Sequence, residues 1–197
     1  MMTAIKARWI TTHLSASRAL RGGMLSAALL ALLLVILFRA CAPSTTATRL
    51  YVGKRASAFT LAAEQAGVLS PAPTTFTPGN GRPTLLIFFY TLCTHCLLEM
   101  QSARNVTGEF TGLRTMYIDS PAERPNLPEM TMHRLGIADP VLLDTDGHVA
   151  ARYGVAYYPA FVLVDGQGIV RDIWTGETGA SSLRAGIQQV LTTPGSR

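Results

Sequence analysis

Cysteine is scarce in this chain. The 197 residues contain only Cys41, Cys93 and Cys96, too few for a domain that is held together by a framework of disulfide bonds. A structural zinc site is also disfavoured, because the chain has no second C-x-x-C pair and only four histidines to complete a ligand set. Two neighbouring cysteines and one distant cysteine indicate a redox-active pair and an odd thiol.

Acidic residues are absent from the first 40 positions, where basic residues account for the whole net charge of +5. The rest of the chain carries equal numbers of acidic and basic side chains. Such a domain lacks the positive footprint that binds a phosphate backbone, so we expect no nucleic-acid partner. Because 48% of the residues are hydrophobic and 15% are charged, the composition excludes wholesale disorder.

Residues 24–38 form an uncharged apolar run, MLSAALLALLLVILF, which follows the basic segment. The positive-inside rule therefore puts residues 1–23 in the cytoplasm and the following chain outside. We predict that residues 24–40 are an uncleaved, single-pass signal anchor in the inner (cytoplasmic) membrane. The alternative is a signal peptide cleaved at the A-x-A pattern Ala40-Cys41-Ala42, and lipidation of Cys41 is a third possibility. In each case the domain is exported to the periplasm.

The rest of the chain predicts a linker over 41–57 and one α/β domain over 58–193. Residues 84–90 are a continuous apolar run after Pro83, typical of a strand buried on both faces. Alternating strands and helices predict a three-layer sandwich with a mixed central sheet, preceded by the one signal-anchor helix. We expect strands at 58–61, 84–90, 113–119, 140–144, 160–165 and 169–174, helices at 93–109, 129–135, 148–153 and 181–191, and a loop over 66–83.

The motif Cys93-Thr94-His95-Cys96 follows the predicted buried strand and opens the first helix of the domain. Residues three apart lie on one helix face, so the two thiols can form and break a disulfide without refolding. The N–H groups and partial positive charge of the helix start stabilise a thiolate at Cys93, and a protonated His95 adds to this. We therefore assign Cys93 as the attacking thiol and Cys96 as the resolving thiol.

The stretch FYTLCTHCLLEM over residues 89–100 resembles the active-site segment of the TlpA/ResA-like membrane-anchored thioredoxins. The later stretch YPAFVLVD, from Tyr158 to Asp165, resembles the family's proline-then-strand segment. The resemblance implies a thioredoxin-like fold and thiol–disulfide oxidoreductase activity without a cofactor or metal. It also implies that Pro159 follows a cis peptide bond and that the Tyr158 backbone contacts the substrate, and we place Thr94 in the substrate site as well.

The resemblance implies partners too: exported, cysteine-containing protein substrates and a membrane electron donor or acceptor. Three positions depart from the family pattern. Leu92 replaces the tryptophan beside the first cysteine, and His95 replaces a proline that often precedes the second. Ile87 occupies the position where thioredoxins often carry a buried acid, so Glu99 in the helix is our candidate for proton transfer.

The direction of electron flow stays open at this point. The family favours a periplasmic disulfide reductase of the kind used in cytochrome c maturation or copper-site assembly. His95 favours the alternative of a DsbA-like oxidase, because stabilising the reduced thiolate makes the disulfide a stronger oxidant. A third possibility is a non-enzymatic Cu(I) chaperone that binds the metal through Cys93, Cys96 and a third soft ligand from residues 130–133. The candidates for that ligand are Met130, Met132 and His133, although methionine in a short helix commonly fills a core.

Overall fold

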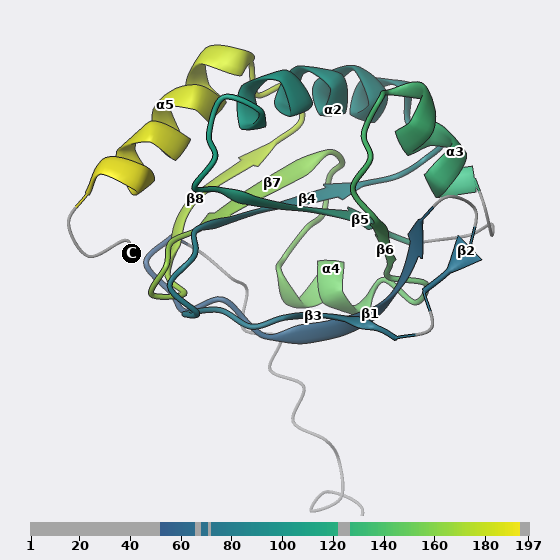
Figure 1. Cartoon of the computed structure of the whole chain (residues 1–197), viewed down its shortest axis with the longest axis horizontal. Coiled ribbons are helices and arrows are strands. Elements are labelled where there is room, and N and C mark those ends of the chain that lie inside the picture. The colour runs from purple at the N-terminus through teal and green to yellow at the C-terminus, as the bar shows by residue number, and fades with distance from the viewer. Residues whose placement is uncertain (1–51, 66–67, 71, 122–126, 194–197) are drawn as a thin grey trace, which may run out of the picture. The chain divides into compact units, whose positions relative to one another are not determined.

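The computed structural model describes residues 52–65, 68–70, 72–121 and 127–193 (Figure 1). The predicted basic segment 1–23, the signal anchor 24–40 and Cys41 lie outside these residues. Within the described ranges, no helix is long and apolar enough to cross a membrane. The anchor and the domain boundaries therefore stay predictions.

The elements follow the predicted order closely. A buried apolar run, a period-2 pattern or a Gly-containing turn marks most of them in the sequence. The strands are β1 (Phe59–Gln65), β2 (Val68–Leu69), β3 (Thr74–Phe76), β4 (Thr84–Phe89), β5 (Arg114–Asp119), β6 (Val141–Leu143), β7 (Ala160–Val164) and β8 (Val170–Thr175). The helices are α2 (Thr94–Thr107), α3 (Leu127–Arg134), α4 (His148–Arg152) and α5 (Ala180–Thr192).

The strands form one mixed sheet in the order β2-β1-β6-β5-β4-β7-β8, with β3 paired to β1. The β4–β5 and β5–β6 pairs are parallel, whereas β1–β6, β4–β7 and β7–β8 are antiparallel. Parallel neighbours need crossover connections, and α2 and α3 supply them. This arrangement confirms the predicted α/β fold with a mixed sheet.

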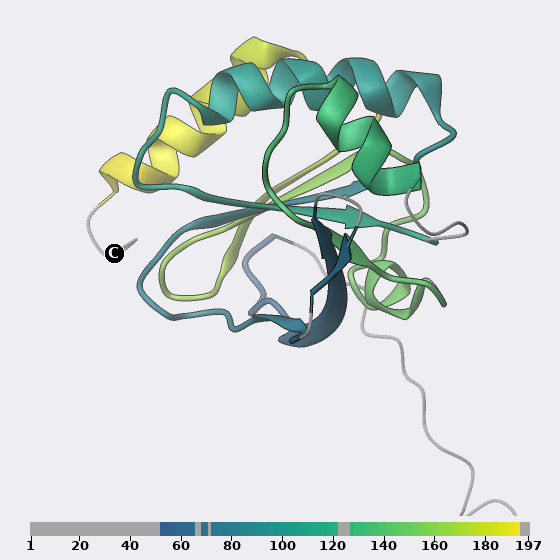
Figure 2. The ribbon, with the colours of Figure 1, turned by 45° about the vertical axis from the view of Figure 1, so that its right-hand side comes forward.

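Two apolar cores lie on the two faces of the sheet, because successive side chains of a strand point in opposite directions. Helices α2, α3 and α5 cover one face, while α4 and the β1–β3 ribbon lie on the other (Figures 1 and 2). Strand β4 serves both cores and is buried along its whole length. It sends Leu85, Ile87 and Phe89 toward the three helices, and Leu86 and Phe88 toward α4.

The predicted loop over 66–83 contains two short strands, so that part of the prediction is wrong. Strand β2 pairs with the end of β1, and β3 pairs with its start. Strands of two and three residues carry almost no sequence pattern, and they exist because β1 offers them a pairing edge. The last part of the predicted linker also packs on the domain, since the Gly53 N–H bonds the Val170 carbonyl and Ala56 is buried.

Candidate active site

The cysteine motif lies at the edge of the sheet where the parallel strands β4, β5 and β6 end. Strand β4 ends at Phe89, a short turn follows, and the Cys93 N–H bonds the Tyr90 carbonyl at 2.9 Å. Helix α2 then begins at Thr94. The buried strand and the helix thus hold the motif from both sides. Carboxyl ends of parallel strands are a common place for functional groups in α/β sheets.

Cys93 is the N-cap residue of α2. Its backbone is extended, and its Sγ accepts a hydrogen bond from the Cys96 N–H at 3.2 Å. Donors at a helix start are otherwise unpaired, so a sulfur that accepts one of them gains stabilisation as a thiolate. This position agrees with the predicted role of Cys93 as the attacking thiol, which stays a prediction.

The two cysteines form a disulfide with their Cα atoms 5.2 Å apart. Their environments differ. Cys96 is fully buried in the core beneath α2, whereas Cys93 is only half-buried. A substrate can therefore reach Cys93 and not Cys96, which suits an attacking thiol and an internal resolving thiol.

The Tyr158–Pro159 segment reaches the same edge from the neighbouring strand. Its peptide bond is cis, as the resemblance implies. Strand β7 runs antiparallel to β4 with Ala160 opposite Phe88, so Pro159 lies beside the end of β4, just before the cysteine turn. Cys93 and Tyr158 pack against the same apolar core. The fold thus brings together two motifs that are far apart in the sequence.

Thr94 and His95 lie on the exposed first turn of α2. The nearest acid to His95 is Glu177, with 4.0 Å between Nδ1 and the carboxylate, and the two side chains are 76% and 82% exposed. Water screens a pair this exposed, so it contributes little to stability. The acid nevertheless opposes the positive charge that a protonated His95 would offer Cys93.

Glu99 faces the loop between β8 and α5. Its carboxylate accepts a hydrogen bond from the Thr178 N–H at 3.3 Å, and the side chain is half-buried. This contact ties α2 to that loop. A role of Glu99 in proton transfer to the cysteines stays a prediction.

A buried acid that the sequence analysis missed, Asp119, lies at the end of β5 beside the cysteine turn. In the parallel register it stands opposite Phe89, and its Oδ1 accepts the Thr91 N–H at 3.1 Å. Its side chain is only 2% exposed. The structure thus holds a carboxylate against the cysteine turn. This carboxylate comes from β5, whereas the position where thioredoxins often carry a buried acid is Ile87 in β4. The signal that could have found it is an acid at the carboxyl end of the strand adjacent to β4.

A network of buried hydrogen bonds connects the loop that contains Tyr158 and Pro159 to α4. The Tyr158 hydroxyl lies 3.5 Å from Ser120 Oγ, which donates to Asp144 Oδ2 at 2.8 Å. Asp144 also accepts the N–H groups of Val149 and Ala150, at 3.1 and 2.9 Å. Because Ser120 and Asp144 are fully buried, these bonds satisfy groups that are costly to leave unpaired.

One cluster in the described part of the chain has residue types that commonly bind metal ions. Asp144, Asp146 and His148 lie close together, but the Asp144 oxygens already accept the bonds of α4 and Ser120. His148 instead donates to Asp146 and holds the pKa of that carboxyl below its usual value.

The three residues considered for Cu(I) lie on α3. Met132 is buried in the core beneath that helix, whereas Met130 and His133 are exposed. Met132 therefore has the core-filling role that methionine commonly takes. Binding of Cu(I) by Met130, Met132 and His133 stays a prediction.

The fold and the disulfide at a helix start define a thioredoxin-like protein. A family model described as the AhpC/TSA family matches residues 52–173, so the chain belongs to that family. The match includes the cysteine motif and the Tyr158–Pro159 segment.

Individual relatives agree with this class. The thiol–disulfide oxidoreductase ResA of Halalkalibacterium halodurans is 27% identical over 101 residues, which are 49% of this chain and 56% of the relative. The chain thus matches about half the length of that relative.

Solved structures show the same fold. One is a putative thiol:disulfide interchange protein DsbE from Chlorobium tepidum, with a TM-score of 0.61 and 19% identity over 72% of this chain and 96% of the other. Another is a putative protein disulfide isomerase from Bacteroides thetaiotaomicron, with a TM-score of 0.62 and 20% identity over 73% and 92%. These matches show a thioredoxin-like fold over nearly three quarters of this chain.

Proposed function

We propose that this chain is a membrane-anchored thiol–disulfide oxidoreductase that reduces disulfides in exported proteins. The observation that carries the proposal is the asymmetry of the cysteine pair. Cys93 is accessible and bonded to the helix start, while Cys96 is buried one turn further along the same helix. The resemblance of residues 89–100 to the TlpA/ResA-like family supports the reductive direction, and the apolar run at 24–38 supports the anchor.

The proposed reaction starts with both cysteines reduced. The Cys93 thiolate attacks one sulfur of a substrate disulfide, and the other substrate sulfur leaves as a thiolate that takes up a proton. Cys96 then loses its proton and attacks Cys93, which releases the second substrate thiol and closes the Cys93–Cys96 disulfide. Two electrons pass to the substrate, and a membrane dithiol donor returns them to the pair.

A protein is the proposed substrate because exposed apolar side chains flank the reactive edge. Leu92, next to Cys93, is 55% exposed, and Tyr157, next to the proline loop, is 74% exposed. The backbone of Tyr158, the residue that follows Tyr157, supplies groups that can pair with an extended segment. Exported proteins with cysteine pairs, including apocytochromes and copper-site proteins, are the proposed class.

The Cys96→Ser variant is expected to accumulate mixed disulfides between Cys93 and its substrates. Without the resolving thiol, the covalent intermediate has no internal route to release. The measurement is non-reducing electrophoresis of cell extracts after acid quenching, with mass spectrometry of the trapped partners. Pro159→Thr is expected to prolong the same complexes, because it alters the loop beside the substrate.

The matched control is the Cys93→Ser, Cys96→Ser double variant, which should trap nothing. The complexes should sediment with membranes and be degraded by protease added outside spheroplasts, as the proposed topology requires. If Cys96→Ser traps no protein while Cys93 can still be alkylated, the oxidoreductase proposal fails and the Cu(I)-chaperone alternative gains support.

The oxidase alternative rests on His95 and is tested by the reduction potential. His95→Gln removes a charge that stabilises the Cys93 thiolate, so the disulfide should become harder to reduce, by up to about 30 mV. Glu177→Gln should shift the potential in the opposite direction, because it removes the opposing carboxylate. Equilibration of the purified chain with glutathione redox buffers measures both values.

An unchanged potential in His95→Gln would remove His95 from the mechanism and leave the oxidase alternative without its main support. The redox state of the Cys93–Cys96 pair in growing cells then tests the direction of electron flow. A Cys93–Cys96 pair that alkylation finds mostly reduced agrees with a reductase, and a mostly oxidised pair contradicts the proposed direction.

A further inference from the structure

A large pocket lies at the opposite end of the sheet from the cysteines. It has a volume of about 840 Å³, and its lining includes the start of β5, the last turns of α2 and the segment before β6. Arg114 at the start of β5 pairs in register with Thr84 at the start of β4, whereas Cys93 follows the end of β4. Redox chemistry at the cysteines therefore makes no use of this pocket.

The pocket is open because β6 is shorter than β5. The β5–β6 pairing begins only at Tyr117 and Val141, which leaves Arg114 to Met116 without a strand on that side. Pro140 precedes β6 and has no N–H to donate, so the ladder stops there. In a parallel ladder alternate residues bond to each side. The Arg114 N–H bonds the Pro83 carbonyl, which lies on the β4 side. The backbone N–H and C=O of the next residue, Thr115, therefore face the pocket.

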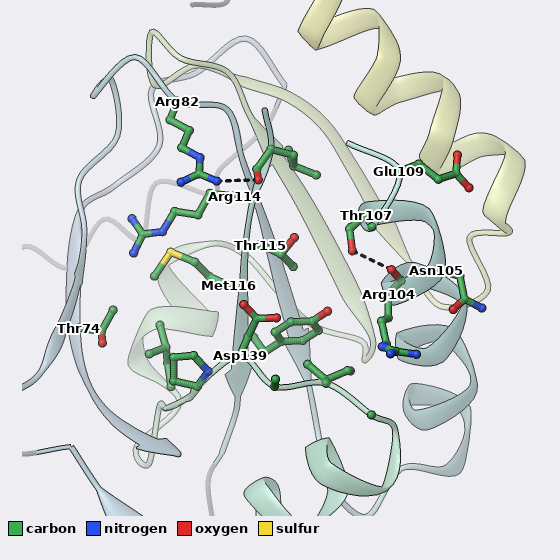
Figure 3. Close-up of a pocket in the computed structure, with 18 residues that line it drawn as sticks. Thr74, Arg82, Arg104, Asn105, Thr107, Glu109, Arg114, Thr115, Met116 and Asp139 are labelled. Atoms are coloured by element: carbon green, nitrogen blue, oxygen red, sulfur yellow. Dashed lines mark hydrogen bonds between the residues drawn. The ribbon is translucent and has the colours of Figure 1, made fainter. Parts of the chain in front are cut away.

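Three guanidinium groups line this pocket, contributed by Arg82, Arg104 and Arg114 (Figure 3). Figure 3 shows Arg82 and Arg114 together on one side and Arg104 on the other. Among the described residues no acid forms an ion pair with any of the three. The arginines that do form ion pairs in that part of the chain are Arg171, with Asp165, and Arg184, with Glu109.

A hydrogen bond fixes Arg82, and Arg104 lies against the backbone of a neighbouring loop. Arg82 donates to the Leu113 carbonyl at 3.1 Å, which leaves its other N–H groups available. Arg104 lies against Gly136, where an added Cβ would approach the guanidinium carbon to 3.4 Å. A larger residue at position 136 would therefore crowd the arginine. Of the three guanidinium groups, the one of Arg82 is thus oriented before any ligand binds.

Two carboxylates also line the pocket, and they do not cancel the positive charge. Glu109 is already bound to Arg184, whose guanidinium holds the pKa of the Glu109 carboxyl below its usual value. Asp139 is exposed and is the second acid of the lining. The three unpaired guanidinium groups therefore face one carboxylate that has no cationic partner among the described residues.

We propose that this pocket binds a small organic polyanion through Arg82, Arg104 and Arg114. Guanidinium groups bind carboxylates and phosphates with paired N–H donors, and such bonds are stronger than neutral ones. A volume of about 840 Å³ is in the usual range for small-molecule sites. A peptide strand is not the proposed ligand, because Thr115 is the one residue of the uncovered β5 edge whose backbone faces the pocket. Asp139 is placed to accept a hydroxyl or ammonium group of the ligand.

The test is isothermal titration calorimetry of the purified full chain with citrate and with inorganic pyrophosphate. We expect saturable binding of at least one probe. The Arg104→Gln, Arg114→Gln double variant should weaken it at least tenfold, since each substitution removes a charge-assisted contact. Preference for citrate would identify a carboxylate site, and preference for pyrophosphate a phosphate site.

Arg134→Gln is the matched control, because Arg134 is an exposed arginine outside the pocket, and it should bind as the unmodified chain does. All variants should keep the reactivity of Cys93, so failure here leaves the proposed oxidoreductase function intact. The inference is overturned if neither probe saturates below about 10 mM, or if the double variant and Arg134→Gln bind alike.

Discussion

Replacing Cys93 with serine is expected to lower the rate of disulfide reduction by roughly a thousandfold or more. A hydroxyl at the same position is not ionised near neutral pH, so the helix start has no nucleophile to stabilise. Reduction of a disulfide-containing protein by the chemically reduced chain, followed by quenched gel analysis, measures this loss.

Two matched variants separate this effect from general damage. Cys41→Ser should reduce the substrate at the unmodified rate, because Cys41 takes no part in the proposed exchange. Cys96→Ser should complete the first attack and then stall as a mixed disulfide. Substantial turnover by Cys93→Ser would contradict the assignment of Cys93 as the attacking thiol.

Replacing Asp144 with alanine is expected to lower the free energy of unfolding by about 3 kcal/mol or more. The buried carboxylate accepts bonds from Ser120 and from the first-turn N–H groups of Val149 and Ala150. Its removal leaves three donors at a fully buried position without their acceptor, and each unsatisfied group costs roughly 1–3 kcal/mol. Such a loss is large beside the total stability of about 5–15 kcal/mol that is usual for a domain.

Denaturant unfolding followed by circular dichroism measures the change. Asp146→Ala is the control, because this acid is exposed and, among the residues that the structure describes, bonds only to its exposed neighbour His148. Its midpoint should stay nearly unchanged. Equal midpoints for Asp144→Ala and Asp146→Ala would mean that the buried bonds are replaced by water and do not hold α4.

Local sequence patterns were sufficient for most of the fold. The apolar run before the cysteines is typical of a strand buried on both faces, and β4 is buried throughout. The position of Cys93 between that strand and a helix followed from the same pattern, and Cys93 is the N-cap of α2. The prediction of a cis peptide bond before Pro159 depends on the family resemblance, because nothing in the local sequence distinguishes cis from trans.

Other features of the fold could not be predicted from local sequence patterns. Strands β2 and β3 depend on the edge of β1, and their few residues carry no periodicity of their own. Local pattern does not predict the burial of Asp119, because an acid at the end of a strand is commonly exposed. It is buried here because β4 and the cysteine turn lie beside it.

The amino-acid sequence by itself determined where the redox pair lies and which thiol is exposed to attack. Both follow from the order of a buried strand and a helix start, which are local properties of a dozen residues. The tertiary structure decided which polar groups support that pair and where the unpaired arginines gather. Those outcomes depend on strand register and strand length, which place Asp119 beside Thr91 and leave the start of β5 uncovered, and contacts between segments distant in the chain are not encoded in any local pattern.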